Sequence, residues 1–356
     1  MKRISSFSLL LLALLSALTL TACDGDFSPP GQPGNGGYSV GETEGLTVHF
    51  IDVGQADATL VVCDGEAMLI DGGNVEDASL IYAYLQEQDI STLQYIIGTH
   101  AHEDHMGGLA GALHAAQAET AFCSVTECDS KYFSSFKKAL GEQGIAMTVP
   151  EIGNSYSLGN AEFQFVGPVQ ETDDANNMSL VVRLVYGDTS FLFTGDAEQS
   201  EESDILEAGF DLSATVLKVG HHGSEGSTSY PFLYAVAPQY AVISCGTGNS
   251  YGHPHEAALS RLRDADVTLY RTDLQGTVVC TSDGQTVSFT TEKNSTAPTN
   301  PTETTDDTIR YIGNVNSHVF HRSDCPGLPA QQNRVYFTDR SDALAGGYAP
   351  CGRCAP

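Results

Sequence analysis

Basic residues are scarce in this chain of 356 residues. Its 16 lysines and arginines face 45 aspartates and glutamates, so the formal net charge is −29 at pH 7. Proteins that bind nucleic acid through a charged surface neutralise phosphates with Lys and Arg. The balance therefore disfavours a binder of that kind. An acidic protein can still approach a phosphate where metal ions supply positive charge locally.

Long apolar runs are also nearly absent, so the sequence predicts no channel of several membrane spans. The one such run, residues 9–20, follows a basic start and is too short for a stable span. It ends in Leu-Thr-Ala-Cys23, which resembles the lipobox of bacterial lipoproteins. The resemblance implies that residues 1–22 are a signal peptide and that Cys23 is lipidated. Ordinary secretion with cleavage nearby is the alternative.

A lipid anchor predicts a place on the bacterial cell surface, on the outer side of the cytoplasmic membrane or on its periplasmic face. Residues 23–44 are rich in Pro and Gly and nearly free of aliphatic side chains, as in a flexible tether. A second polar stretch, residues 291–308, reads as a linker. Between them we expect a folded body at 45–290, and after the linker a small unit at 309–356.

The body alternates strand-like and helix-like segments, which indicates an α/β architecture. Strands are expected at 46–52, 58–63 and 67–70, with an Asp-Gly turn between the last two, and a helix is expected at 78–88. Three of its cysteines lie in apolar strands and are expected to be buried thiols: Cys63, Cys245 and Cys280. Cys123 and Cys128 lie close enough in sequence to pair.

Three histidines and two acids occur within residues 99–105, THAHEDH. The stretch follows an apolar run and leads into glycines, so we expect a loop at the carboxyl end of a strand. His100 and His102 are two apart in an extended segment and can hold one metal ion. Asp104 and His105 lie at the turn into a helix and can hold a second. Imidazole and carboxylate suit zinc, manganese or iron.

This H-x-H-x-D-H pattern resembles the signature of the metallo-β-lactamase superfamily. Further motifs of that superfamily follow in the expected order: LIDGG (69–73), FTGD (193–196) and LKVGHHGS (217–224). Other stretches resemble the hydrolase domain of the ComEC competence proteins and their stand-alone relatives: HFIDVGQADATLV (49–61), NNMSLVVRL (176–184) and YGHPH (251–255). The resemblance covers essentially all of residues 46–290. It implies an αββα sandwich, in which two mixed sheets lie between outer helices.

The resemblance also implies roles for matching positions. Six of them would bind two divalent metals, zinc or manganese: His100, His102, Asp104, His105, Asp196 and His221. Asp196 would bridge the metals, and His221 would complete the second site, with its order relative to His222 left open. Asp71 would support the metal loop. The implied catalytic residues are His222 and His253, which would face the substrate, together with Asp104.

One departure from the lactamases bears on the substrate. Lactamases place a third histidine on the first metal, whereas the corresponding stretch here carries Asn177 and Ser179, which are weak zinc ligands. The first site is therefore expected to be more open, which argues against β-lactam hydrolysis and leaves room for a phosphate oxygen. Asn177 and Ser179 have the alternative role of hydrogen-bonding the loop. Lys218 is expected either to meet a phosphate or to form a salt bridge at a strand end.

Two metals in one cage would generate a hydroxide nucleophile near neutral pH. Phosphodiester, phosphoester, thioester and lactone hydrolysis all fit this chemistry, and the resemblance favours a phosphodiesterase or nuclease linked to uptake or degradation of DNA. The alternatives are a hydrolase of another surface ester, such as phosphocholine on a wall polymer, and a surface binding protein without catalysis. A phosphodiester substrate and a membrane are the expected partners; no protein partner is predicted.

The last 48 residues are too few to bury much core, so they need a further stabilising element such as a structural metal or a disulfide. Four residues have the spacing of a closed Cys3His zinc site: His321, Cys325, Cys351 and Cys354. The segment resembles the zinc-binding domain of Ada, the methylphosphotriester repair protein. In that family the first ligand is a methyl-accepting cysteine, and His321 stands there instead, so methyl transfer is not expected. A disulfide between two of the three cysteines is the alternative, and His318 is a second candidate ligand.

Overall fold

The computed structural model describes residues 45–293, 311–322, 325–330, 333–337 and 340–354. The predicted signal peptide, the lipidation site Cys23, the tether and most of the linker lie outside these residues. Within them, no helix is long and apolar enough to cross a membrane.

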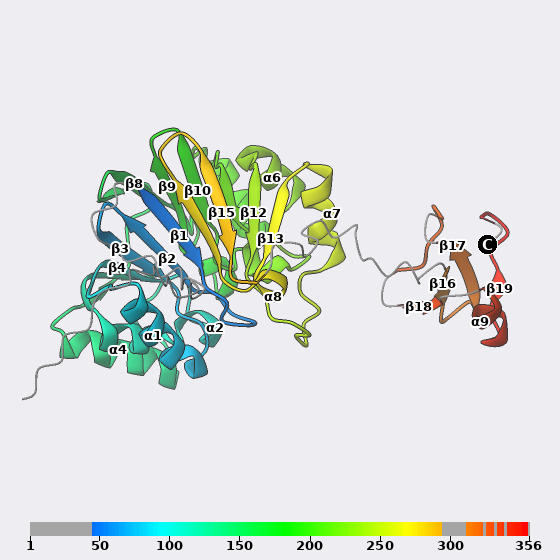
Figure 1. The fold of residues 1–356 in the computed structure, drawn as a ribbon, viewed down its shortest axis with the longest axis horizontal. Coiled ribbons are helices and arrows are strands. Elements are labelled where there is room, and N and C mark those ends of the chain that lie inside the picture. The colour runs from blue at the N-terminus through cyan, green and yellow to red at the C-terminus, as the bar shows by residue number, and fades with distance from the viewer. Residues whose placement is uncertain (1–44, 294–310, 323–324, 331–332, 338–339, 355–356) are drawn as a thin grey trace, which may run out of the picture. The chain divides into compact units, whose positions relative to one another are not determined.

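The body contains two mixed sheets that face each other (Figure 1). The first has eight strands in the spatial order β15 (Val287–Thr291), β14 (Val278–Ser282), β1 (Leu46–Phe50), β2 (Thr59–Cys63), β3 (Glu66–Ile70), β4 (Thr92–Gly98), β5 (Gln117–Cys123) and β6 (Met147–Thr148). The second has seven in the order β13 (Thr268–Arg271), β12 (Tyr240–Ile243), β11 (Val216–Lys218), β10 (Thr189–Phe193), β9 (Val181–Tyr186), β8 (Ala161–Gly167) and β7 (Ser155–Leu158).

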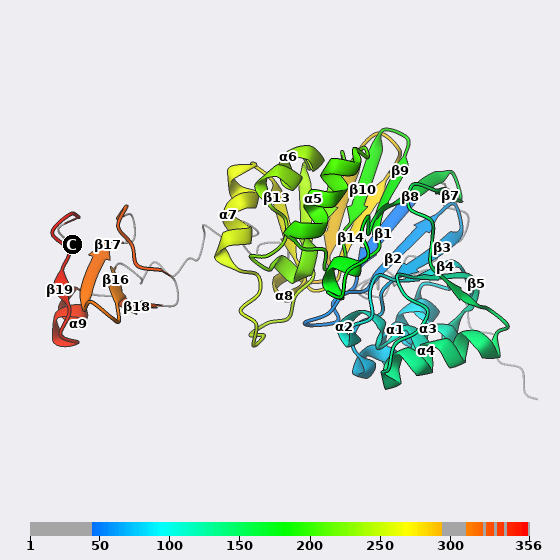
Figure 2. The ribbon, with the colours of Figure 1, turned by 180° about the vertical axis from the view of Figure 1, so that it is seen from behind.

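Helices cover the outer face of each sheet (Figures 1 and 2). Those against the first sheet are α1 (Ala78–Glu87), α3 (Leu109–Ala115) and α4 (Lys131–Glu142), with the short α2 (Glu103–Met106) at its edge. Those on the second sheet's side are α5 (Gln199–Ala208), α6 (Tyr230–Val236), α7 (Glu256–Asp264) and the short α8 (Thr272–Gln275). Three 3-10 turns complete the body: η1 (Val75–Asp77), η2 (Asn176–Met178) and η3 (Gly220–Gly223).

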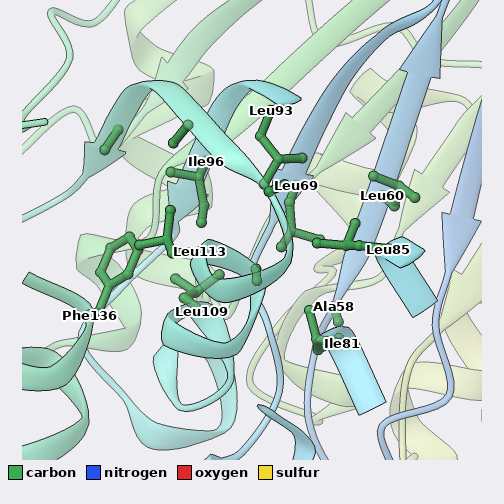
Figure 3. Close-up of a cluster of buried hydrophobic side chains, with 14 of the residues drawn as sticks. Ala58, Leu60, Leu69, Ile81, Leu85, Leu93, Ile96, Leu109, Leu113 and Phe136 are labelled. Atoms are coloured by element: carbon green, nitrogen blue, oxygen red, sulfur yellow. The ribbon is translucent and has the colours of Figure 1, made fainter. Parts of the chain in front are cut away.

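The layers are held together by three buried apolar clusters. The central one fills the space between the sheets and includes Phe50, Phe163 and Phe193. Figure 3 shows the cluster between the first sheet and its helices, where Leu69 and Ile96 meet Leu109. A third cluster lies under α5, α6 and α7. The side chains of β2 are buried along the whole strand because both faces of the sheet are covered.

This architecture confirms the predicted αββα sandwich. The expected helix at 78–88 is observed as α1, and the expected hairpin turn at Asp64-Gly65 joins β2 to β3. The thiols of Cys63, Cys245 and Cys280 are fully buried, as predicted. The possible pairing of Cys123 with Cys128 does not occur. Both are free thiols, with Cys123 packed near Met106 and Cys128 hydrogen-bonded to the Ser130 hydroxyl.

The C-terminal unit is a separate small sheet. Its strands have the spatial order β18 (Arg334–Phe337), β16 (Tyr311–Asn314), β17 (Val319–Arg322) and β19 (Ala349–Pro350), and one helix, α9 (Arg340–Ala345), follows β18. Phe320, Ile312 and Ala343 are buried, and among the described residues of the unit they make up a very small apolar core. So few buried apolar side chains leave the unit in need of a further stabilising element.

Candidate metal centre

The parallel strands of both sheets end at one edge of the sandwich, and the candidate ligands follow those ends. In the first sheet β3 and β4 are parallel, so Asp71 after β3 lies beside Thr99 after β4. In the second sheet β10 and β11 are parallel, so Asp196 and His222 leave neighbouring strand ends. The carboxyl ends of parallel strands are the usual place for sites in open α/β sheets. This register explains why residues from distant parts of the sequence share one cage.

The histidine loop runs from the end of β4 into α2, as the sequence predicted for a strand-to-helix loop. Asp71 anchors it from beneath. Its carboxylate accepts hydrogen bonds of 2.8 Å each from the Thr99 backbone N–H, the Thr99 hydroxyl and the His105 Nδ1–H. Asp71 and His105 are 2 % and 0 % exposed. Because Nδ1 of His105 is engaged, its Nε2 is presented to the cage.

Four residues offer one donor atom each within 4.8 Å of one another: Asp104, His105, Asp196 and His222. His105 Nε2 lies 3.2 Å from Asp196 Oδ1, and both atoms are buried without a hydrogen-bond partner. Orphaned buried donors and acceptors are costly unless something satisfies them. A divalent cation would satisfy this set, whose imidazole and carboxylate chemistry suits zinc or manganese. The residues present therefore fit a metal.

The histidines of the cage share a pattern expected of ligands. Each has one ring nitrogen fixed by an outer partner: His105 by Asp71 (2.8 Å), His222 by the Ser244 carbonyl (3.1 Å), His221 by Glu198 (3.0 Å) and His100 by the Ser179 hydroxyl (3.2 Å). The other nitrogen of each ring lies 3.2 to 4.0 Å from a carboxylate oxygen of Asp196. Outer partners of this kind fix the tautomer and aim the ring at a metal.

The predicted first site is less compact. His100 Nε2 and His102 Nδ1 lie 3.0 Å apart, and Asp196 Oδ2 lies 4.0 Å from His100 Nε2. These three side chains are those predicted for the first metal, and Asp196 is also a member of the four-donor set. The carboxylate of Asp196 thus lies between the two groups. Gly195 adopts a φ of +50°, and a Cβ there would lie 2.9 Å from the Ser179 hydroxyl, so glycine is required beside Asp196.

The structure reverses the predicted order of the two adjacent histidines. His222, expected to face the substrate, is 2 % exposed and belongs to the four-donor set, with Nε2 3.3 Å from Asp104 Oδ2. His221, expected in the second site, is more exposed and lies over Asp196 Oδ2. Both have left-handed backbone angles in η3, and their ring planes lie at 69° to each other. Sequence adjacency alone could not decide which ring turns inward.

Buried charges stabilise one another in the cage. Burial alone would lower the pKa of His222, but the carboxylates of Asp196 and Asp57 outweigh it and raise that pKa to about 10. Burial likewise opposes the charge of Asp196, yet His105 and His222 hold the pKa of Asp196 well below its ordinary value. A metal that enters must therefore displace protons from imidazoles.

A cleft of about 310 Å³ opens onto the cage. Four imidazoles and three carboxylates line it: His102, His221, His222 and His253, with Glu103, Asp104 and Asp196. His253 comes from the loop before α7, and its Nδ1 accepts a 3.3 Å hydrogen bond from the Gln55 amide. Burial and neighbouring imidazoles lower the pKa of His253 to about 4, so its ring is neutral near pH 7.

The C-terminal unit gathers a second donor set. His321, Cys325, Cys351 and Cys354 each place one ligand atom within 4.8 Å of the others. His321 Nδ1 lies 3.4 Å from Cys325 Sγ, and three backbone N–H groups point at the sulfurs, those of Arg322, Gly327 and Arg353. All three cysteines are free thiols rather than disulfide-bonded. The arrangement fits the closed Cys3His site predicted from the sequence. His318 pairs instead with the Tyr348 ring.

Comparison with known families identifies both parts. The family model described as the metallo-beta-lactamase superfamily matches residues 51–247, which is more than half of the chain. The chain belongs to the metallo-β-lactamase superfamily. A second model, the metal binding domain of Ada, matches residues 302–356.

Two curated relatives resemble the superfamily domain. ComE operon protein 3 of Bacillus subtilis (strain 168) is 29% identical over 250 residues, which cover 65% of this chain and 32% of that protein. Competence protein ComA of Neisseria gonorrhoeae is 33% identical over 235 residues, which cover 63% and 30%. The chain therefore spans about a third of the length of these relatives. Among solved structures, the metallo-beta-lactamase fold protein YhfI from Bacillus subtilis aligns with 67% of this chain and 100% of its own, at 11% identity and a TM-score of 0.46.

Within the superfamily domain, Asn177 and Ser179 serve the loop rather than the cage. The Ser179 hydroxyl accepts from the Asp196 backbone N–H at 3.0 Å and lies against His100, while Asn177 Oδ1 accepts from the Glu198 N–H at 3.1 Å. Both side chains are committed to these contacts. The loop-supporting alternative is the one observed.

Lys218 forms the buried salt bridge that was one of its two expected roles. Its Nζ lies 2.8 Å from Asp57 Oδ2, and both side chains are nearly fully buried. Asp57 Oδ1 in turn lies 3.5 Å from His222 Nδ1. Asp57 was missed at the sequence level, although it sits in the motif at 49–61. Glu198, which fixes His221, was also missed, although it lies only two residues after Asp196, the last residue of the FTGD motif.

Proposed function

We propose that the protein is an extracytoplasmic metal-dependent phosphodiesterase that cleaves nucleic acid, with DNA as its main substrate. The single observation that carries the proposal is that a four-donor set lies beside the imidazole pair of His100 and His102, while the stretch that carries a third histidine in lactamases has Asn177 and Ser179 here. Such a cage offers a free coordination face for a phosphate oxygen. The competence proteins that resemble this chain support a role in uptake or degradation of DNA at the cell envelope.

Two divalent metals, when bound, lower the pKa of a water and polarise the phosphate oxygen. Asp104, His105, Asp196 and His222 would hold one of them. His100 and His102 would hold the other with a second oxygen of Asp196. Asp71 and the Ser244 carbonyl keep His105 and His222 in the tautomers that leave Nε2 free.

His253 contributes a hydrogen-bond donor. The Gly246 N–H donates to Gln55 Oε1 at 3.0 Å, which fixes the amide so that its Nε2 donates to His253 Nδ1. A neutral His253 then carries its proton on Nε2. We infer that this N–H stabilises negative charge that develops on a phosphate oxygen or on the leaving oxygen. His221, exposed at the cleft, is the second imidazole in reach of substrate.

The acidic composition is compatible with a low-affinity nuclease whose metals meet the phosphate. The C-terminal unit adds a local exception to that acidity. Residues 309–356 contain five arginines and three aspartates, with no lysine or glutamate. We propose that this unit holds one structural zinc ion and makes an accessory contact with DNA. A membrane anchor through Cys23 remains part of the proposal.

The test uses the full chain, chelated and reconstituted with manganese or zinc. Its substrates are single-stranded DNA, p-nitrophenyl phosphorylcholine and nitrocefin. We expect DNA cleavage by the protein and by the control Asp211→Ala, which alters a surface carboxylate paired with Arg183. Asp196→Ala should lose at least about 10³-fold, because it removes the shared carboxylate. Cleavage of the phosphorylcholine ester alone would favour the surface-ester alternative, and binding of DNA without turnover would favour a binding protein.

A further inference from the structure

We propose that Tyr251 is a stacking platform for the nucleobase next to the scissile phosphate, which makes it a specificity-determining residue of the active-site cleft. The inference rests on the proposed function, because it names the part of a nucleic acid that the site would recognise.

Three aromatic rings form a ladder that leads out of the cage. His222 and His253 are stacked, with centroids 6.3 Å apart and planes at 28°. His253 and Tyr251 are stacked in turn, at 5.6 Å and 23°. Burial falls along the ladder: His222 is 2 % exposed, whereas Tyr251 is 67 % exposed. A large aromatic side chain this exposed beside a metal cage leaves ring surface available to a planar group.

The loop that carries Tyr251 is held firmly in place. The Asn249 side-chain oxygen accepts from the N–H groups of Tyr251 and His253, at 3.1 and 3.0 Å. The Asn249 amide donates to the carbonyls of Gly246 and His253. A further contact comes from His255, whose Nε2 donates to the Tyr251 carbonyl at 3.1 Å. The tyrosine is thus presented on an ordered loop, which reduces the entropy lost when a ligand stacks on it.

A second hollow continues from the metal cleft past Tyr251. It measures about 760 Å³ and shares Gln55, Glu103, Asp104 and Tyr251 with the cleft. At its other end lie Val75, which is 50 % exposed, and Glu76. Among the described residues that line the two hollows, none is a lysine or arginine.

This lining decides which part of a nucleic acid fits. Carboxylates beside the hollow repel further phosphates, so the metals are left as the positive charge that the backbone meets. A base carries no charge, and its amino groups can donate to carboxylates. Stacking on an aromatic ring is worth about 1–3 kcal/mol per base and tolerates any sequence. The base flanking the phosphate on the metals is therefore the group that suits Tyr251.

The chain contains no tryptophan, so Tyr251→Trp introduces a single fluorescent reporter that keeps the ability to stack. The probe is a hydrolysis-resistant, phosphorothioate-linked oligodeoxycytidylate, added in the presence of manganese. We expect its bases to quench the indole emission at least about twofold, and an abasic oligomer of equal length to leave it unchanged. Tyr234→Trp is the matched control, since Tyr234 is 89 % exposed on α6 and lines neither hollow. It should respond to neither oligomer.

A kinetic arm checks the same claim. For Tyr251→Ala we expect KM for single-stranded DNA to rise about 5- to 150-fold, and the preference for a base-bearing over an abasic cleavage position to disappear. A loss equal on both substrates, or no quenching of the Tyr251→Trp variant by the base-bearing oligomer, overturns the platform. Quenching by phosphocholine, which has no chromophore of its own, in place of the oligomer also overturns it, in favour of a quaternary ammonium on the ring. If the unmodified chain cleaves no phosphodiester at all, the proposed function fails instead.

Discussion

Asp71 supports the cage from behind its ligands. It accepts three hydrogen bonds, including one from His105 Nδ1, and so fixes the ring that offers Nε2 to the metal. Asp71→Asn keeps the shape but replaces an acceptor with a donor and removes the negative charge. We expect the metal affinity to fall about 10- to 100-fold, measured by competition with a chelating dye. Saturating metal should restore most of the activity.

Asp283→Asn is the matched control for Asp71→Asn, because Asp283 caps an exposed turn by accepting from the N–H groups of Gln285 and Thr286. It should leave metal affinity unchanged. Equal affinities for the Asp71 variant and the unmodified protein would contradict the supporting role.

Glu201 is a buried carboxylate away from the ligands. It accepts from the Val169 N–H at 2.8 Å, and burial raises its pKa from 4.5 to about 7. The folded state therefore keeps a proton that the unfolded chain releases. The stability from this proton is full below about pH 4.5 and is lost as the pH rises through about 7, a loss of about 3 kcal/mol.

Glu201→Gln stays neutral at every pH and can still accept from Val169. We expect the variant to be more stable than the unmodified protein by about 1–3 kcal/mol above pH 7, with the difference vanishing near pH 4, below the pKa of the unfolded chain. Urea unfolding at the two pH values, at fixed metal concentration, measures it. Glu207→Gln on the exposed side of α5 serves as control. A difference that is the same at both pH values would contradict the assignment.

At the scale of elements, α1 and α3 approach each other at Gly111. A Cβ at this position would lie 2.2 Å from the Ala78 carbonyl oxygen, and backbone cannot yield as a side chain can. Gly111→Ala should therefore destabilise the body by about 2 kcal/mol or more, despite the better helix propensity of alanine. Gly141 in α4 would have nothing within 4 Å of a Cβ added in the same way. Gly141→Ala should instead stabilise by up to about 1 kcal/mol.

Chemical denaturation of the two glycine variants gives both values under one condition. The prediction concerns their opposite signs, since each adds the same methyl group to a helix. Destabilisation of similar size in both variants would show that α1 and α3 do not approach as closely as described.

The helices and strands also show how much of the fold could be predicted from the sequence. The pattern of apolar residues predicted β1, β2, β3 and α1, whereas β5, β6, β14 and β15 of the first sheet were not predicted. The H-x-H-x-D-H stretch placed its loop at a strand end. The resemblance supplied Asp196 and the motif of the late histidines. The sequence could not supply the orientation of the two late histidine rings. His221 and His222 are adjacent, and the left-handed backbone of η3 decides which ring is buried in the cage.

Contacts across the fold were beyond the sequence for a related reason. Lys218 and Asp57 are 161 positions apart, and their salt bridge depends on the register of β11 against its neighbours. Both outcomes considered for Lys218 were compatible with its place at a strand end. The ring ladder through Tyr251 likewise forms only when the loop after β12 is folded beside the cage.

At the scale of the whole molecule, the body and the C-terminal unit should bind metal independently. The unit's donor set uses three thiols and His321 and shares no residue with the cage. Cys351→Ser should lower the metal content of the full chain by one equivalent, measured by elemental analysis after dialysis. Cys128→Ser, at a half-buried cysteine outside the donor sets of the described residues, should keep the full content. An unchanged count in Cys351→Ser would contradict the site.

The most direct test of the account is the rate of bis(p-nitrophenyl) phosphate hydrolysis by chelated full-length protein as manganese or zinc is added back. The proposed cage requires two metals in the body, so turnover should appear only as the second body equivalent binds, and Asp196→Ala should show none. Full occupancy of the body sites, proven by metal analysis, with no hydrolysis of the phosphodiester would contradict the central claim.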